Sequence, residues 1–380
     1  MRLVKLFALL TLAAAVVAGQ DFEIDTTTPE GQIIQQIGST DDPQIKLQML
    51  EQFVQKYPDH EAIPWILAQI PPIYAALNQP AKSLAACEKL LAKDPTNAAA
   101  AHACLKTAEA QKDPELLKKW ALLANAAAVK RLAKPKPDFE YQEDEDTWNE
   151  QVEFAKQVKQ YSEWSLYNAA LQAQDPAQKA ALVDALRQAN PESEHLPQLT
   201  QLVFAAYVQA GKLDEAVKMA DAADATGKAS TGMMLVAADH YFNNKQPDKS
   251  LAYCKKIIAA NEGKAAPAGV DAAAWAKQTK AELGRAYWMM GVTYSTQGKY
   301  VSADKALRKA LPNVKGNAPL LAGALFHLGL ANFKLGNKSG SQDRILAAFK
   351  YTKQCAAMKS PFQAQARKNL AAIQSQYRIK

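Results

Sequence analysis

The chain has 380 residues, of which 48% are hydrophobic and 22% charged, and its formal net charge is +7. Runs of alternating valine, isoleucine and threonine are absent, which excludes a protein built mainly from β-strands. Residues 21–200 carry 17 basic and 27 acidic side chains, whereas residues 201–380 carry 26 and 11. The basic C-terminal half could meet an acidic peptide, an anionic glycan or a membrane surface, or could simply present solvated helix faces.

The N-terminus has the pattern of a targeting segment. Arg2 and Lys5 precede an uncharged, mostly aliphatic run that ends in the small residues Ala18 and Gly19. This order is typical of a secretory signal peptide, so we expect residues 1–19 to be removed and the mature chain to be exported, to a periplasm or outside the cell. A retained N-terminal anchor is the alternative. No later stretch has about 20 uncharged apolar residues, so no transmembrane segment is expected.

The rest of the chain predicts two blocks of helical hairpins. Residues 20–133 form the first block, in which proline-containing turns separate amphipathic helices. Residues 134–146 combine alternating lysine and proline with a dense acidic run and predict an exposed linker. The hairpins resume over residues 147–360, with an insertion at 261–280. The last residues, 361–380, predict a helix that caps the open end of the stack.

A repeat of 34 residues organises both blocks. Tyr207 recurs as Tyr241, and the residues around each follow the same pattern. A further copy lies upstream, because residues 79–92 match residues 246–259 almost residue for residue. Pairs of amphipathic helices at this interval are typical of a stacked array in which no unit can bury its apolar face alone.

Two later repeats carry a family pattern of small and aromatic residues. Its residues are Met290, Gly291, Tyr294, Gly298, Tyr300, Ala303, Leu307 and Ala310 in one repeat, and Leu328, Gly329, Phe333, Leu335, Gly336, Ser341 and Ala348 in the next. The chain resembles the tetratricopeptide repeat family, in the form of an exported bacterial-type protein. The resemblance implies an all-α solenoid of stacked hairpins, wound as a right-handed superhelix whose first helices line a concave groove for peptides or partner proteins. Asn332 and the pair Pro71 and Pro72 depart from the pattern, and a kink is expected at the two prolines.

In co-chaperones of this family, Lys and Asn side chains in the groove clamp a C-terminal carboxylate. The matching positions here are Gln201, Ala205, Leu235, Asp239, Trp288, Val292, Phe326 and Leu330, so no such clamp is expected. After residue 230 the groove positions become apolar, aromatic and charged. The predicted partner groove consists of Leu235, Asp239, Phe242, Arg285, Trp288, Phe326, Phe333 and Lys334. This strip suits an extended peptide with an acidic residue; the alternative is that the insertion or the C-terminal helix covers it.

The search for reactive chemistry gives no candidate. No HExxH, GxSxG or P-loop motif occurs and the five histidines are scattered, so no catalytic residue, cofactor or metal site is predicted. His102 and Cys104 lie two positions apart on one helix and point to different faces. The acidic run 143–146 lacks the ligand spacing of a calcium loop. Nucleic acid is disfavoured as a partner because export is expected.

The four cysteines are too sparse for a disulfide framework. Buried thiols are one interpretation for all of them. A bridge between Cys87 and Cys104 is the other for that pair, because their helices should pack together. The sequence as a whole predicts a non-catalytic scaffold that binds a protein or peptide in its groove. A structural or assembly subunit of a cell-envelope complex, held by helix edges, is one alternative; a glycan-binding protein or enzyme is another.

Overall fold

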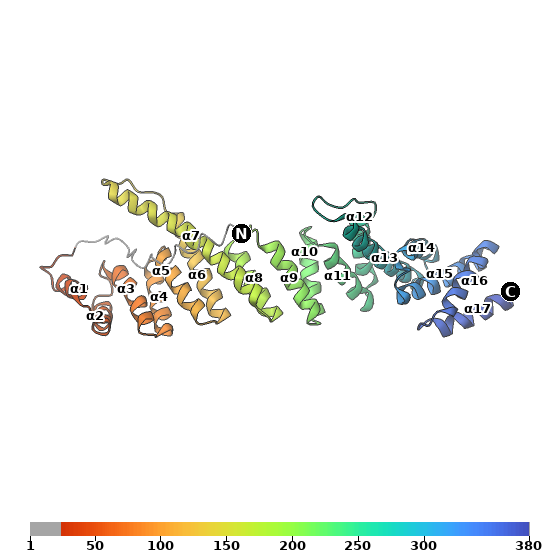
Figure 1. The fold of residues 1–380 in the computed structure, drawn as a ribbon, viewed down its shortest axis with the longest axis horizontal. Coiled ribbons are helices and arrows are strands. Elements are labelled where there is room, and N and C mark those ends of the chain that lie inside the picture. Colours follow the sequence, from red (N-terminus) through yellow and green to blue (C-terminus); the bar gives the residue numbers. More distant parts are fainter. Residues whose placement is uncertain (1–23, 380) are drawn as a thin grey trace. The chain divides into compact units, whose positions relative to one another are not determined.

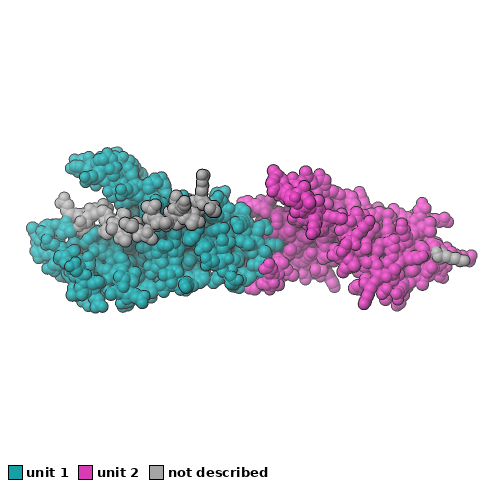
Figure 2. All heavy atoms as spheres, in the orientation of Figure 1, with its two compact units in different colours: residues 1–206 teal, residues 207–380 magenta. Residues whose placement is uncertain are grey.

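The computed structural model describes residues 24–379, and within them all regular secondary structure is helical (Figure 1). Seventeen helices follow one another along this part of the chain, which confirms the all-α prediction. These residues form two compact units, unit 1 up to Ala206 and unit 2 from Tyr207 onward (Figure 2). The signal peptide expected at residues 1–19 lies outside the described residues.

Unit 1 is built from consecutive helical hairpins. Helices α1 and α2, α3 and α4, α5 and α6, and α7 and α8 pack as pairs, and each pair packs on the next. The first helices also touch one another, because α3 contacts α5 and α5 contacts α7. The bounds are α1 (Pro29–Ser39), α2 (Pro43–Lys56), α3 (Ile63–Ala76), α4 (Pro80–Lys93), α5 (Ala98–Ala110), α6 (Pro114–Leu132), α7 (Gln142–Gln172), α8 (Pro176–Ala189) and α9 (Leu196–Gln209), which contains the boundary between the units.

Unit 2 follows the same plan. Helices α11 and α12, α13 and α14, and α15 and α16 pack as pairs, and α17 packs on α16. The first helices again touch, α11 with α13 and α13 with α15. The bounds are α10 (Leu213–Ala225), α11 (Thr231–Asn243), α12 (Pro247–Asn261), α13 (Ala272–Thr296), α14 (Tyr300–Val314), α15 (Ala318–Ser339), α16 (Gln342–Ala357) and α17 (Gln363–Tyr377).

Capping side chains and prolines in the sequence mark where many of the helices begin. Six helices begin with proline, whose missing N–H is not needed in the first turn: α1, α2, α4, α6, α8 and α12. The side chain of Asp42 caps α2 by accepting hydrogen bonds from Gln44 and Ile45. Asp113 does the same for α6 and Asp271 for α13.

Most of the hairpin turns share one backbone conformation. In six of them, the residue two positions before the second helix is left-handed, with φ between 55° and 73°: Asn78, Lys112, Gly211, Lys245, Gly298 and Gly340. The next N–H donates to a tyrosine carbonyl five residues back in four of these turns, at Tyr74, Tyr207, Tyr241 and Tyr294. The repeat of Tyr207 as Tyr241 therefore marks the end of a first helix.

Small residues allow the paired helices to approach each other closely. A Cβ atom on Gly291 would lie 2.3 Å from Cγ of Leu307, and one on Gly329 would lie 2.4 Å from Oγ1 of Thr352. These contacts join α13 to α14 and α15 to α16. By length and composition α15 is the one helix of residues 24–379 that could cross a membrane, but half of that stretch is buried in unit 2, as in a core helix.

The cysteines divide between the two interpretations. Cys87 on α4 and Cys104 on α5 form a disulfide whose Cα atoms are 6.3 Å apart, so the bridge holds for this pair. Cys254 and Cys355 are buried thiols in unit 2. Burial raises the pKa of Cys254 to about 12 and that of Cys355 to about 11, which leaves both protonated and unreactive.

Two segments differ from the sequence prediction, and a third, helix α3, contains the two prolines at which a kink was expected. Helix α7 begins at Gln142 and includes the acidic run, because acidic side chains are favourable in the first turn of a helix. Since α7 packs on α6 within unit 1, the non-helical residues 134–141 join two helices of the same unit. Helix α13 begins within the expected insertion, so only 262–271 is non-helical. Helix α3 continues through Pro71 and Pro72, and Ser83 donates a 2.8 Å hydrogen bond to the carbonyl of Pro71.

Candidate functional site

All eight residues of the predicted partner groove lie on three adjacent first helices of unit 2. Because α11 contacts α13 and α13 contacts α15, the exposed sides of these helices form one continuous face. Seven of the eight side chains are half-buried and one, Lys334, is exposed. Helix α11 carries Leu235, Asp239 and Phe242, helix α13 carries Arg285 and Trp288, and helix α15 carries Phe326, Phe333 and Lys334.

An ion pair links the first two of these helices. Nε and Nη2 of Arg285 lie 2.8 and 2.7 Å from Oδ1 of Asp239, and each side chain is 31% exposed. The guanidinium carbon lies 5.2 Å from the centre of the Trp288 ring, within the range of a cation–π contact. The charge of Arg285 is thus held in place at the surface and keeps free N–H groups for a further acceptor.

An aromatic pair lies beside the ion pair. The rings of Phe242 and Trp288 are 5.5 Å apart and tilted by 55°. Both side chains are half-buried and pack against a core cluster made of Val292, Leu307, Val314, Ala324 and Leu328, so each has one buried and one accessible side. The indole also lies against α15 at Gly323, and its Nε1 is buried without a hydrogen-bond partner. Trp288 is therefore partly core and partly surface.

The other end of the strip is packed against the C-terminal helix. Phe326 stacks on Phe362, which caps α17, at 5.0 Å between ring centres. Phe333 meets Tyr377 edge-on at 6.5 Å, and the Tyr377 hydroxyl donates a hydrogen bond to Asn337. Helix α17, one of the two elements that could cover the strip, therefore contacts it. The structure thus groups Asp239, Phe242, Arg285 and Trp288 together and separates Phe326 and Phe333 from them.

Two of the basic side chains of unit 2 bind a buried carboxylate within the unit. Asp304 on α14 is buried and accepts hydrogen bonds from Arg308, Arg344 and Asn332 at 2.9, 2.7 and 2.7 Å. Burial alone would raise the pKa of Asp304, but the hydrogen bonds from Arg344 and Asn332 and the charge of Arg308 outweigh it and hold this pKa below its usual value. Asn332, which departs from the family pattern, is thereby a member of the network that joins α14, α15 and α16.

Unit 1 has a polar cluster on its own first helices, which sequence reasoning missed. Glu109 on α5 accepts hydrogen bonds from Tyr161 at 2.7 Å and from Ser165 at 2.6 Å, both on α7. Lys106 lies 3.2 Å from the same carboxylate. His102 is nearly buried, contacts Tyr161 edge-on, and has a pKa lowered mainly by burial. No group of three or more potential metal-binding side chains occurs within residues 24–379.

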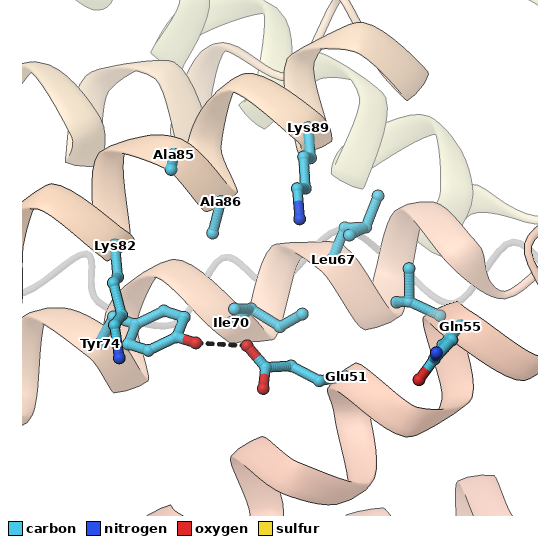
Figure 3. A pocket seen from close by; sticks show the side chains of 10 residues that line it. Glu51, Gln55, Leu67, Ile70, Tyr74, Lys82, Ala85, Ala86 and Lys89 are labelled. Atoms are coloured by element: carbon cyan, nitrogen blue, oxygen red, sulfur yellow. Dashed lines mark hydrogen bonds between the residues drawn. The ribbon is translucent and has the colours of Figure 1, made fainter.

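A groove between α2 and α4 was also missed (Figure 3). Its volume is about 410 Å³, and it combines an apolar floor from α3 with charged side chains from both walls. Lys82 and Lys89 lie seven positions apart on α4, a spacing that could have indicated a shared face. The distance between α2 and α4, which creates the groove, has no signal in the sequence.

No protein-family model matches the chain, and no curated protein is detectably similar to it. Among solved structures, it is similar to the tetratricopeptide repeat domain of P58(IPK), with 12% identity, coverage of 92% of this chain and 99% of that chain, and a TM-score of 0.24. A tetratricopeptide repeat protein from Parabacteroides merdae has 12% identity, coverage of 80% and 98%, and a TM-score of 0.26.

The APC/C hetero-tetramer Cut9–Hcn1 is similar at 11% identity, with coverage of 93% of this chain and 91% of that chain and a TM-score of 0.29. The class of protein follows from the chain's own repeats, paired helices and shared turns: it is a tetratricopeptide-like array of helical hairpins.

Proposed function

We propose that the chain is a non-catalytic scaffold that binds a partner protein or peptide on the first helices of unit 2. The observation that carries this proposal is the grouping of Phe242, Trp288, Arg285 and Asp239 on the continuous face of α11 and α13. Half-buried aromatic rings beside an ordered arginine have the composition of an interface hot spot.

The chemistry of this face indicates the kind of partner. The accessible sides of Phe242 and Trp288 provide apolar contact area, and Arg285 keeps N–H groups that Asp239 does not use. Lys334 adds an exposed cation on α15. We therefore propose a segment that places an apolar side chain next to an acidic one. Because Phe326 and Phe333 pack on α17, the proposed contact is centred on α11 and α13.

Site-specific crosslinking can test this proposal in the intact chain. A benzophenone amino acid at Leu235 or Lys334 should capture a partner from native extracts, and the same group at Val301, an exposed residue of α14, is the matched control. The captured protein should then bind the purified chain about tenfold less tightly after Leu235→Asp, a loss of about 1.4 kcal/mol, and Val301→Asp should leave its affinity unchanged.

The structural-subunit alternative predicts a different result. In that case the partner would be retained by Leu235→Asp and lost when the terminal helix α17 is disturbed, for example by Phe362→Ala. That outcome would move the contact from the face of α11 and α13 to the edge of unit 2. Capture at Val301 with the same yield as at Leu235 would contradict the proposed site directly.

We also propose that the scaffold works outside the cytoplasm. The basic, apolar and small-residue order of the N-terminus supports export. The disulfide between Cys87 and Cys104 accords with an oxidising compartment. Cell fractionation combined with the mass of the mature N-terminus tests this: a chain that still begins at Met1 in the cytoplasm would contradict it.

A further inference from the structure

The groove of unit 1 has an apolar floor made by one helix. Leu67, Ile70 and Tyr74 of α3 lie along this floor, spaced so that they share one face. Val54 from α2 and Ala86 from α4 extend the apolar surface at the sides. The walls are therefore two helices and the floor is a third, a geometry that matches the hydrophobic groove into which an amphipathic helix docks.

At the tyrosine end of the groove, Glu51 and Lys82 both lie close to Tyr74. The Tyr74 hydroxyl donates a short hydrogen bond to Glu51, and this bond is the main cause that raises the pKa of Tyr74 to about 12 (Figure 3). The ammonium group of Lys82 lies 5.6 Å from the centre of the Tyr74 ring. Glu51 is the one carboxylate among the lining residues, and it lies at this end.

The other end is dominated by an unpaired cation. The amine of Lys89 points into the groove above Leu67, and the opposite wall there carries the neutral side chain of Gln55 (Figure 3). Lys82 and Lys89 make no ion pair with any residue in the described range 24–379, whereas the adjacent Glu88 pairs with Lys119. At 1.5 Å per residue, the two lysines are about 10 Å apart along α4.

We propose that this groove binds an amphipathic helix of a partner protein. Its apolar side chains contact Leu67 and Ile70, and two acidic side chains seven positions apart pair with Lys82 and Lys89. Half of the ten lining residues are exposed, so the groove is open along its length. A small amphiphile would keep much of its surface in water there, whereas a helix needs to bury only one face.

This proposal is separate from the binding face of unit 2 and can be tested without knowing the partner. A phage library of helical peptides with randomised surfaces is selected on the full chain. Clones are then sorted by whether Ala85→Trp, which fills the groove from its exposed wall, abolishes binding. Ala81→Trp is the control, because Ala81 is exposed on the same helix but does not line the groove.

The selected clones that depend on Ala85 should carry acidic residues seven positions apart with apolar residues between them. A synthetic peptide of that sequence should bind Lys89→Glu roughly tenfold less tightly, and should bind Lys93→Glu, an exposed change outside the groove, as it binds the unaltered chain. A peptide with lysine in place of the facing acid should regain affinity for Lys89→Glu. Circular dichroism confirms that each variant is folded.

Two results would overturn the proposal. One is that no selected clone distinguishes Ala85→Trp from Ala81→Trp. The other is that the clones which do so lack the paired acids and bind Lys89→Glu unchanged. Decanoate tests whether the groove instead binds a free amphiphile, which also combines an apolar chain with a negative charge. If decanoate saturates the groove and helical peptides do not bind, the helix proposal is wrong.

Discussion

The indole of Trp288 on α13 lies so close to Gly323 on α15 that a Cβ atom at position 323 would be 3.0 Å from Nε1. This contact fixes the buried side of the ring and leaves its other side on the proposed binding face. Substitution Gly323→Ala should push the ring away from α15 and lower the free energy of unfolding by about 1–3 kcal/mol. Urea denaturation of the full chain measures the change.

The control is Gly232→Ala on α11, where the added Cβ meets nothing nearer than Ser230 Oγ at 3.9 Å. Alanine is the better helix former, so this variant should be as stable as the unaltered chain or more so by up to about 1 kcal/mol. If Gly323→Ala behaves in the same way, the position of Trp288 is not set by this contact.

The hairpin turns give a prediction that concerns the backbone alone. Lys245 has φ of 55° at a turn position that glycine occupies in three other turns, Gly298 among them. A residue with a Cβ atom pays about 1–2 kcal/mol to adopt this left-handed conformation. Glycine avoids that cost, but it loses more conformational entropy on folding, which offsets part of the gain. Lys245→Gly should therefore stabilise the chain by about 0.5–1 kcal/mol, measured by thermal unfolding.

The reverse change checks the cause. A Cβ on Gly298 would meet no atom within 4 Å, so Gly298→Ala has no steric clash with neighbours and tests only the left-handed conformation. It should destabilise the chain by about 1 kcal/mol. A stable Gly298→Ala together with a neutral Lys245→Gly would show that the turns relax to another conformation at little cost.

How much the sequence could predict differs between the fold and the site. Helices, hairpins and turns were predictable because caps, prolines and the Tyr207–Tyr241 repeat are local signals. The exposure of Trp288 and Phe326 was not, because it depends on which later helix packs over them. The pairing of Cys87 and Cys104 lay between these cases, since the sequence places them on adjacent helices and leaves their relative orientation open.

The network around Asp304 gives a prediction for stability. Asp304→Asn leaves Arg308 and Arg344 near a neutral amide in place of a carboxylate, and should lower the free energy of unfolding by about 1–3 kcal/mol at neutral pH. Because the folded pKa of Asp304 is depressed, its stabilising effect is present above the unfolded pKa of about 3.9 and is lost as the pH falls through the folded value. The two chains should therefore converge in stability at strongly acidic pH. A difference that persists there would mean that packing, and not charge, carries the effect.

His327 predicts a second pH dependence. It is buried on α15 with Nδ1 3.0 Å from Ser295 Oγ, and burial lowers its pKa to about 4. The unfolded pKa is about 6.5, so the unfolded state binds the proton first and stability should fall as the pH drops from about 6.5 towards 4. His327→Gln can keep a hydrogen bond to Ser295 and should flatten the curve in this range. An unchanged slope would assign the acid sensitivity to other groups.

The disulfide between Cys87 and Cys104 predicts both a thiol count and a stability change. Unfolded, non-reduced protein should expose two free thiols, Cys254 and Cys355, whereas four would exclude the bridge.

The bridge joins α4 to α5 across 17 positions of sequence, so it restricts the unfolded chain. Changing both cysteines to serine should therefore lower the stability of unit 1 by about 2–4 kcal/mol. Hydrogen exchange resolved by peptide can follow the two units separately. Faster exchange in α4 and α5 with no change in α13 and α14 is expected, and equal protection of α4 and α5 with and without the bridge would show that packing alone holds these helices together.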